Sequence, residues 1–443
     1  MDKRIYTVIE NKKRELDSRI FFALAMNERN YSVGFGKKQN LYQYSNYIKK
    51  GLFLMKSIGP RNYDKILNLK KNGHQVSSWD EEGFVIFNDE FTKIRNDVRC
   101  LKEIDYLYTW GSEQNKNLQN VFPQFQKKII STGHPRFDLL KKENRFFLEH
   151  DAQKIRDKYG KFILVVTKFG VGNAVMDWRT RDNKVFRSKH DISNEIFQKK
   201  TMESFIKTLI SLSEKCPEIN IIVRPHPAEN ISKWHEIFDN HKKIRVVYDY
   251  QNTCCWIAAS QYIISTNCHT SMESYLLGKQ SINFAPVQDK EVEFDIFKKV
   301  SHNIESPEEL IEIVSNSIKN NFQLNLKNVE EDYLLKNISN LKINSFELME
   351  ETINDSLKQI ENTNDKYTSH LNYLLFRFIK KIRNFKNNFL ADKQLLTLSS
   401  QKIDFITLEE INEKVKKYDF KFNTKKIKIS EKYPGIFIFE KID

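Results

Sequence analysis

The feature that most constrains the fold is an alternation of short apolar segments with longer amphipathic ones, which occurs twice. The first run covers about 4–133, and the second begins near 160 and continues to about 286. Segments rich in Val, Ile, Phe and Tyr favour β-strands, and strands separated by helices favour a parallel sheet with crossover helices. The sequence therefore predicts an α/β protein with two doubly wound halves, each of about 150 residues.

Each half contains several expected strands. In the first half they cover 4–10, 31–36, 51–57, 74–79, 105–111 and 127–133. In the second half they cover 161–169, 219–225, 244–250, 261–266 and 281–286, with helices near 198–216, 229–241, 252–259 and 271–278. Doubly wound sheets bind ligands at the carboxyl ends of their strands, so we expect two Rossmann-like domains facing a cleft.

The C-terminal third has a different pattern. From about 306 we expect no further strands, because Ser306 precedes an acidic first turn as an N-cap does and long helical segments follow at about 330–362 and 367–390. The expected domains are two Rossmann-like halves at 1–150 and 151–305, and a helical extension with a basic tail at 306–443.

Charge and cysteine content narrow the partners and the compartment. The net charge of +14 favours an anionic partner such as a nucleotide, a phosphorylated lipid or a membrane surface, although a solvated basic surface explains it equally well. We expect no nucleic-acid partner, because zinc-ligand spacing and aromatic RNA-binding signatures are missing. Five cysteines without pairing motifs, no signal-peptide pattern and no run of 18 apolar residues favour a cytoplasmic protein, soluble or peripheral at the inner membrane.

The segment VRPHPAEN, residues 223–230, ends one of the expected strands. Two prolines fix φ and remove backbone donors, so the strand stops and a rigid loop follows. We expect this loop to present Arg224, His226 and Glu229 at the nucleotide site, where cationic and imidazole groups pair with phosphate or a base carbonyl. The alternative is a histidine that only caps the loop.

A second candidate is STNCHTSMESYLLGK, residues 265–279. A strand ends at Thr266, and Thr270 and Ser271 open a helix whose exposed N–H groups and dipole favour an anion. We expect Glu273, placed in the first turn, to accept hydrogen bonds from ribose hydroxyls. Thr270 or Ser271 acting only as an N-cap is the alternative.

A third candidate is the acidic run Asp80, Glu81 and Glu82, which follows another strand and ends at Gly83. Crowded carboxylates raise one pKa and suit a general base or a nucleophile. A solvated acidic turn is the alternative.

In the segment 131–140, Gly133 and Pro135 predict a tight turn, and we expect a mainly structural role for Arg136 and Asp138.

Taken in chain order, these motifs resemble bacterial surface-carbohydrate biosynthesis proteins, which are GT-B glycosyltransferases related to the CDP-glycerol glycerophosphotransferases. The segments that carry the resemblance are RELDSRIFFALAM, SWDEEG, TGHPRFD, RPHPAE and STNCHTSMESYLLGK. An acidic pair before Gly83, a His-Pro pair at 226–227 and a hydroxyl pair at 270–271 are also similar to bacterial sialyltransferases and Kdo transferases. Those enzymes use CMP-activated nonulosonic acids.

The resemblance implies a glycosyltransferase of capsule or lipopolysaccharide synthesis, which moves a nonulosonic-acid-type sugar from a CMP-activated donor to a glycan or lipid-linked glycan. The domain at 1–150 would then lie on the acceptor side, and the domain at 151–305 would bind the nucleotide sugar. His226 would then bind the CMP phosphate or cytidine, Thr270 and Ser271 the phosphate, and Glu273 the ribose. One of the three carboxylates would act on the acceptor hydroxyl or the anomeric carbon, and the match to an acidic pair before glycine favours Glu82 or Glu81 over Asp80. No DxD motif stands in the expected place, so we expect no metal and no cofactor, with protein donors stabilising the leaving phosphate.

Two other functions are compatible with the same residues. One is a polyol-phosphate transferase that uses CDP-glycerol or CDP-ribitol, since that class shares the GHPR and RPHP elements. The other is a non-catalytic basic protein that binds a membrane or a nucleic acid on a transferase scaffold.

The segment 370–398 predicts a basic amphipathic helix. Leucine, phenylalanine and isoleucine recur at helical spacing, with lysines and arginines on or beside that stripe. Such a helix suits an anionic membrane surface. Packing of the apolar stripe on the protein core is the alternative.

Overall fold

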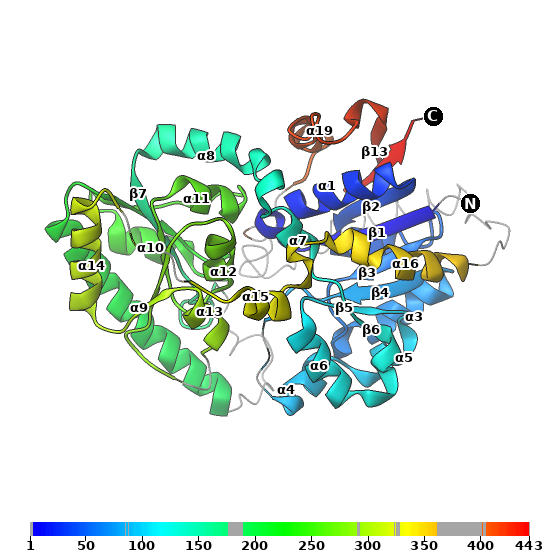
Figure 1. Ribbon diagram of the computed structural model, residues 1–443, viewed down its shortest axis with the longest axis horizontal. Coiled ribbons are helices and arrows are strands. Elements are labelled where there is room, and N and C mark those ends of the chain that lie inside the picture. Colours follow the sequence, from blue (N-terminus) through cyan, green and yellow to red (C-terminus); the bar gives the residue numbers. More distant parts are fainter. Residues whose placement is uncertain are drawn as a thin grey trace, which may run out of the picture. The chain divides into compact units, whose positions relative to one another are not determined.

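The computed structural model describes residues 3–84, 86, 88–175, 189–289, 293–322, 324, 328–360, 401 and 405–442. The chain forms two compact units (Figure 1). Unit 1 comprises Met1–Leu139, Glu330–Ala391 and Phe405–Asp443, and unit 2 comprises Leu140–Val329 and Asp392–Asp404.

The sheet of unit 1 has the strand order β13-β14-β2-β1-β3-β4-β5-β6. The strands β1 to β6 are parallel, and they are β1 (Lys3–Ile9), β2 (Tyr31–Lys37), β3 (Leu52–Met55), β4 (Gln75–Trp79), β5 (Leu107–Thr109) and β6 (Ile129–Ser131). The chain adds β2 on one side of β1 and then β3 to β6 on the other. The strand order therefore reverses between β1 and β3, which is where doubly wound sheets bind ligands.

Helices cover both faces of this sheet. α2 (Lys38–Gln43), α3 (Tyr63–Lys71) and α5 (Val98–Glu103) share one apolar cluster with β1, β3 and β4. α1 (Lys12–Glu28) and α16 (Ser345–Lys358) contact the sheet on the other side. The ring of Phe21 in α1 meets Phe346 of α16 and Phe422 beyond α19 (Leu408–Lys416), so α1 is buried nearly all round. The remaining helices are α4 (Asp89–Arg95), α6 (Ser112–Val121), α7 (Pro135–Asp138) and α15 (Glu331–Asn337).

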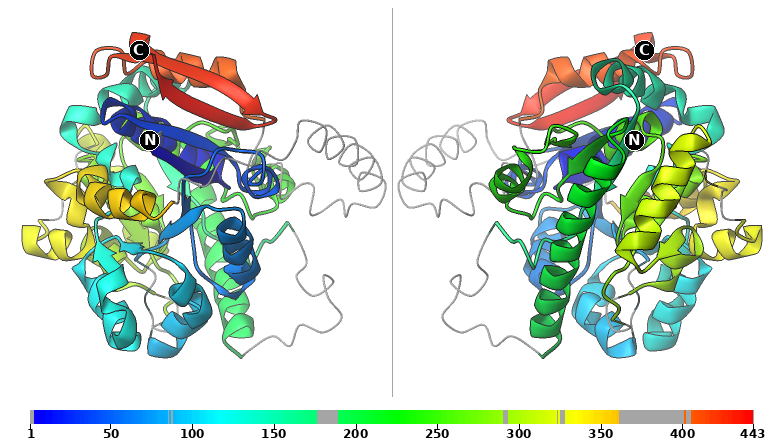
Figure 2. Two further views of the ribbon diagram at one scale, coloured as in Figure 1. Left: turned by 90° about the vertical axis from the view of Figure 1, so that its right-hand side faces the viewer. Right: turned by 90° about the vertical axis from the view of Figure 1, so that its left-hand side faces the viewer.

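The hairpin β13 (Ile427–Tyr433) and β14 (Ile436–Lys441) completes the sheet of unit 1. β14 pairs antiparallel with β2, with Phe437 opposite Phe35 and Phe439 opposite Val33, and Figure 2 shows the red hairpin beside the blue N-terminal strands. The expectation that strands cease after 306 is therefore wrong. Two of the lysines taken for a basic tail, Lys428 and Lys432, lie on the edge strand β13, where exposed charges discourage further pairing.

The sheet of unit 2 is parallel throughout, in the order β12-β11-β10-β7-β8-β9. Its strands are β7 (Phe162–Val166), β8 (Asn220–Arg224), β9 (Ile244–Val246), β10 (Ile263–Ser265), β11 (Ser281–Phe284) and β12 (His302–Ile304). The chain adds β8 and β9 on one side of β7 and then β10 to β12 on the other. This order is that of a dinucleotide-binding fold, with its reversal between β7 and β10.

Between residues 140 and 329, the described helices of unit 2 are α8 (Phe146–Tyr159), α9 (Lys189–Lys215), α10 (Ile231–Phe238), α11 (Thr253–Ala259), α12 (His269–Leu276), α13 (Asp295–Lys299) and α14 (Pro307–Lys319). An apolar cluster of β7, β8, β10 and β11 side chains with α9, α10 and α14 forms the core.

Most expected strands and helices are confirmed, and so are the two parallel α/β halves. Ser306 caps α14, because its hydroxyl accepts a hydrogen bond of 3.0 Å from the N–H of Glu309. The helix expected at 330–362 is divided into α15 and α16 by the irregular residues 338–344. The basic amphipathic helix expected at 370–398 lies outside the described residues.

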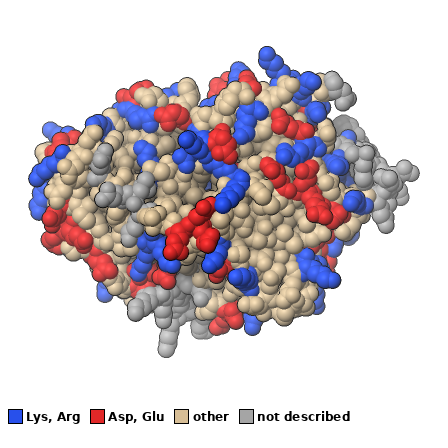
Figure 3. All heavy atoms as spheres, viewed as in Figure 1, with Lys and Arg blue, Asp and Glu red and all other residues tan. Residues whose placement is uncertain are grey.

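No helix among the described residues combines the length and the apolar character needed to cross a membrane. On the face drawn in Figure 3, lysines and arginines are interspersed with aspartates and glutamates. The net positive charge is therefore not gathered into one patch on that face.

Candidate functional site

The loop after β8 is fixed by the buried carboxylate of Glu229. Its Oε1 accepts hydrogen bonds from the Thr167 hydroxyl (2.7 Å) and from the N–H groups of Phe169 (2.9 Å) and His226 (3.1 Å). Its Oε2 accepts from Trp234 Nε1 at 2.7 Å. Burial raises the pKa of Glu229 to about 7, although the hydrogen bonds that its carboxylate accepts act in the opposite direction. Glu229 thus joins the loops after β7 and β8 from within and is not accessible at the surface.

His226 is exposed in this loop. Its Nδ1 accepts a hydrogen bond of 3.2 Å from the N–H of Ala228. A neutral imidazole carries one proton, so this bond assigns the proton to Nε2 and makes Nε2–H a donor. The loop therefore presents a hydrogen-bond donor at the carboxyl end of β8.

Arg224, the last residue of β8, is already engaged. Its guanidinium donates to Asp249 Oδ1 at 2.8 Å and to the carbonyl of Gln251 at 3.3 Å, and it lies 4.5 Å from the ring centre of Trp256. Only 4% of the residue is exposed. The geometry thus gives Arg224 a bracing role beside the loop, and its predicted contact with a nucleotide stays a prediction.

The helix α12 begins at the carboxyl end of β10, with Cys268 as its N-cap residue. Thr270 is 8% exposed, and its hydroxyl has no hydrogen-bond partner among the described residues. Ser271 is fully buried, and its hydroxyl lies 3.2 Å from that of Ser265. A buried hydroxyl without a partner is costly. The predicted contacts of Thr270 and Ser271 with a phosphate stay predictions.

Glu273 is placed differently from the expectation. Because α12 starts at His269, Glu273 lies beyond the first turn, and it is buried. Its predicted contact with ribose stays a prediction.

Lys168, which the sequence reading missed, follows β7 at the reversal of strand order. Its Nζ donates a 2.8 Å hydrogen bond to the carbonyl of Asn267, which follows β10, and it lies 5.5 Å from the ring centre of Phe294. Asn267 has a φ of 45° and is held by Asn283 Oδ1 and the N–H of Phe294. A cation is therefore fixed between β7 and the start of α12.

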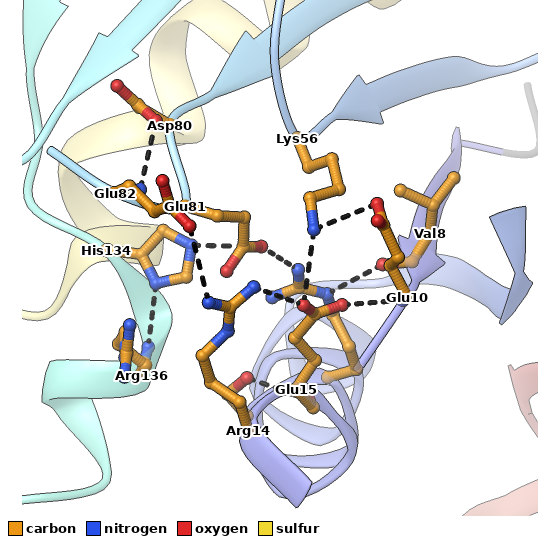
Figure 4. Close-up of polar contacts among 12 residues, drawn as sticks. Val8, Glu10, Arg14, Glu15, Lys56, Asp80, Glu81, Glu82, His134 and Arg136 are labelled. Atoms are coloured by element: carbon orange, nitrogen blue, oxygen red, sulfur yellow. Dashed lines mark hydrogen bonds and ion pairs between the residues drawn. The ribbon is translucent and has the colours of Figure 1, made fainter. Parts of the chain in front are cut away.

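The acidic run of unit 1 is divided among three environments (Figure 4). Glu81 is buried and forms an ion pair with Arg19, whose guanidinium lies 4.5 Å from the ring centre of Trp79. Burial alone would raise the pKa of Glu81, but Arg19, and to a smaller extent His134 and Arg14, lower it well below its ordinary range. Glu81 is thus a buried counter-ion.

Asp80 and Glu82 differ in exposure. Asp80 accepts hydrogen bonds from Arg95 Nη2 (2.6 Å), Gln114 Nε2 (2.8 Å) and the N–H of Glu82 (3.0 Å), so it braces the turn. The side chain of Glu82 is 52% exposed, and its carboxylate lies 3.9 Å from the guanidinium groups of Arg14 and Arg95. Glu82 is therefore the carboxylate of the run that presents itself to solvent.

Charged residues that the sequence reading did not single out lie at the reversal between β1 and β3. Glu15, in the first turn of α1, accepts hydrogen bonds from the N–H of Glu10 (2.7 Å) and from Arg14 (2.8 Å). Lys56, which follows β3, pairs with Glu10 at 3.1 Å and with Glu15 at 3.5 Å. Burial alone would raise the pKa of Glu15, but Lys56, Arg14 and Arg19 lower it.

His134 follows β6 and meets the same cluster. Its Nδ1 accepts a hydrogen bond from the N–H of Arg136 at 3.2 Å, and its Nε2 lies 3.5 Å from Glu81 Oε1. Burial lowers the pKa of His134, and the neutral ring therefore points its Nε2–H toward Glu81.

The turn around His134 is braced by residues that return to unit 1 late in the chain. Asn340 Nδ2 donates to Asp138 Oδ1 (2.7 Å) and to the carbonyl of His134 (2.9 Å), and its Oδ1 accepts from the N–H of His134 (3.1 Å). Ser345 Oγ donates to Asp138 Oδ2 at 2.6 Å. Arg136 lies over the ring of Trp110 at 5.6 Å.

The comparisons with known proteins concern the fold. No family model matches the chain, and no curated protein matches it. Two solved structures of wall teichoic acid polymerase TagF variants, one of them soaked with CDPG, have a TM-score of 0.50. Their sequences are 15% and 13% identical to this chain. The matches cover 81% and 82% of this chain, respectively, and 90% of each TagF chain. A Methanocaldococcus jannaschii UDP-GlcNAc 2-epimerase is 13% identical and has a TM-score of 0.49. The match covers 80% of this chain and 100% of the epimerase chain.

The chain has the GT-B fold. Units 1 and 2 are its two Rossmann-like domains, so the fold expected from the motif order is confirmed. Within the GT-B domain formed by unit 2, the ends of β10, β7 and β8 place α12, Lys168 and His226 on neighbouring strands.

A hollow of about 450 Å³ lies at the opposite, amino edge of the sheet of unit 2. Its lining residues are Lys158, Tyr159, His235, Phe238, Asp239, His241, Lys242, Ile244, Arg245, Val246 and Val247. α8 and α10 both end there, and cations balance the negative ends of helices. Its basic residues are thus explained by the fold, and we assign the hollow no ligand.

Proposed function

We propose that this chain is a transferase of bacterial surface-polymer synthesis, which moves a group from a cytidine-nucleotide donor to a hydroxyl of a glycan or lipid-linked glycan. The observation that carries the proposal is the convergence of α12, Lys168 and His226 at the carboxyl edge of unit 2. The start of α12 offers backbone N–H groups and the positive end of a helix dipole to a phosphate.

On the donor side, Thr270 and His226 supply hydrogen bonds. The hydroxyl of Thr270, which has no partner among the described residues, lies in the first turn of α12, and the tautomer assigned to His226 makes its Nε2–H a donor. When the donor reacts, negative charge grows on the nucleotide phosphate that leaves. Fixed donors at that phosphate lower the barrier because they are already oriented.

On the acceptor side, we assign the base to Glu82. The acceptor oxygen forms a bond to the reacting atom of the donor, the bond from that atom to the nucleotide phosphate breaks, and the hydroxyl proton passes to the Glu82 carboxylate. Glu82 is chosen because it is the exposed carboxylate of the run, whereas Asp80 and Glu81 are held by Arg95 and Arg19.

The donor we favour is a CDP-linked polyol such as CDP-glycerol. Support comes from the likeness in fold to TagF, one of whose structures was soaked with CDPG. A CMP-activated nonulosonic acid is the rival donor. We also propose that the reaction needs no metal and no cofactor, with the residues of unit 2 supplying the charge that balances the phosphate; turnover should then persist in EDTA.

The test is release of CMP from CDP-glycerol and of CMP from a CMP-activated sialic acid, each with a lipid-linked glycan acceptor. His226→Ala should cost about 2–4 kcal/mol of transition-state stabilisation. His235→Ala, an exposed histidine on α10, is the matched control and should leave turnover unchanged. Full turnover by the His226 variant would refute its assigned role. Salt-dependent membrane or nucleic-acid binding without any nucleotide response would refute the transferase.

A further inference from the structure

We infer that unit 2 is built for a nucleoside diphosphate, with Lys168 as the residue that recognises the second phosphate. The inference rests on the proposed donor site and names its substrate class. It follows from three groups that stand at the carboxyl ends of three neighbouring strands.

The strand order sets the spacing of these groups. β10, β7 and β8 are adjacent and parallel, and neighbouring strands lie about 4.8 Å apart. The start of α12 follows β10, Lys168 follows β7 and His226 follows β8. The outer two groups are therefore separated by two strand spacings, roughly 10 Å, and Lys168 lies between them.

The backbone of Lys168 is in this middle position, and its side chain is held toward the start of α12. Its Nζ donates to the carbonyl of Asn267, two residues before the first residue of α12. Asn267 adopts the left-handed conformation that asparagine tolerates, and hydrogen bonds to Asn283 and Phe294 keep it there. The ammonium group thus has a fixed place beside the start of α12 and need not be ordered when a ligand binds.

A single phosphate at the start of α12 uses the helix N–H groups and Thr270. The next phosphate of a diphosphate would lie toward β7, where the Lys168 ammonium balances its added charge. His226, one strand further on, then donates to the far side of the diphosphate. A donor with a single phosphate would contact the start of α12 but would leave Lys168 and His226 without a phosphate partner.

Binding of CDP and CMP to the full-length protein, measured by calorimetry, tests the inference. We expect wild-type protein to bind CDP about ten-fold or more tightly than CMP. Lys168→Gln should remove most of this preference by weakening CDP, with CMP changed less than about two-fold, and Lys168→Arg should restore part of it. Lys161→Gln, at the amino end of the same strand, is the matched control and should keep the preference.

Equal affinity of the wild-type protein for CDP and CMP would overturn the diphosphate inference and leave a cytidine-nucleotide site in place. Equal weakening of both ligands by Lys168→Gln would overturn the role of Lys168. Binding of neither nucleotide would overturn the proposed donor site itself, and the inference with it.

Discussion

The hydroxyl of Thr167 and the carboxylate of Glu229, which are 62 residues apart in the chain, meet in a 2.7 Å hydrogen bond beneath the candidate donor site. Thr167 follows β7 and Glu229 follows β8, so this bond fixes the relative positions of Lys168 and His226, which adjoin it. Its strength depends on a buried carboxyl group that titrates near neutral pH.

The first prediction concerns this carboxyl. Its pKa rises from an ordinary 4.5 to about 7 on folding, so between these values the folded protein binds a proton that the unfolded chain releases. The contribution of Glu229 to the free energy of unfolding should therefore decrease by about 3 kcal/mol as pH rises through this window. Glu229→Gln should abolish that component in urea denaturation, whereas Glu82→Gln should keep it. Identical pH profiles of wild type and Glu229→Gln would contradict the prediction.

The second prediction concerns His74, whose contribution to stability changes with pH in the opposite direction. Its Nδ1 accepts from the N–H of Gly51 (3.2 Å), and its Nε2 lies 2.8 Å from the carbonyl of Ser45, so the neutral ring is satisfied. Burial lowers its pKa to about 4. The contribution of His74 to stability should fall by about 3 kcal/mol as pH drops from 6.5 to 4. Glu229 contributes with the opposite sign over much of this range, so the histidine component is the difference between the pH profiles of wild type and His74→Gln. The exposed His235→Gln should keep the wild-type profile. Identical pH profiles of wild type and His74→Gln would count against the buried neutral histidine.

The third prediction separates the members of the acidic run. Glu82→Gln should lower turnover about 10²-fold or more with little change in Tm, because its exposed carboxylate is the proposed base. Asp80→Asn should lower Tm, because three hydrogen bonds to its carboxylate brace the turn. Turnover assays and thermal melts of both variants check this. Full activity of Glu82→Gln would remove it from the mechanism.

The fourth prediction compares two glycines with positive φ. Gly133 has a φ of 75°, and a Cβ there would lie 1.9 Å from Asn340 Oδ1. Gly160 has a φ of 68°, and a Cβ there would meet nothing within 4 Å. Gly160→Ala should cost about 1 kcal/mol from backbone strain alone, and Gly133→Ala should cost about 3 kcal/mol or more because Asn340 must also move. Equal losses in urea denaturation would show that the Asn340 contact is unimportant.

Local sequence patterns predicted the strands and the loop of unit 2 well. The apolar runs before Thr167 and Pro225 are long enough to mark buried parallel strands, and the two prolines mark where β8 must end. The same reasoning missed Lys168, although a charged residue directly after such a run is itself a signal. Recording the polar residues that follow every parallel strand would have included it.

Other features depend on contacts between distant parts of the chain. The sequence cannot show that Arg19 on α1 neutralises Glu81 or that Asn340 braces His134, because 62 and 206 residues separate these pairs. The hairpin was missed for a related reason. The sequence does not show that β2 pairs with a strand from the C-terminal end of the chain, so the lysines of the hairpin were taken for part of a basic tail.

Pairing of β14 with β2 has a consequence for how the protein is made. The ribosome completes β2 at Lys37 and reaches β14 only at Ile436, 399 residues later. At about 5–20 residues per second, this leaves the edge of β2 open for roughly 20–80 s of translation. The first domain to be synthesised is therefore the last to be completed, and nascent chains halted before Ile436 should depend on chaperones that shield an open sheet edge.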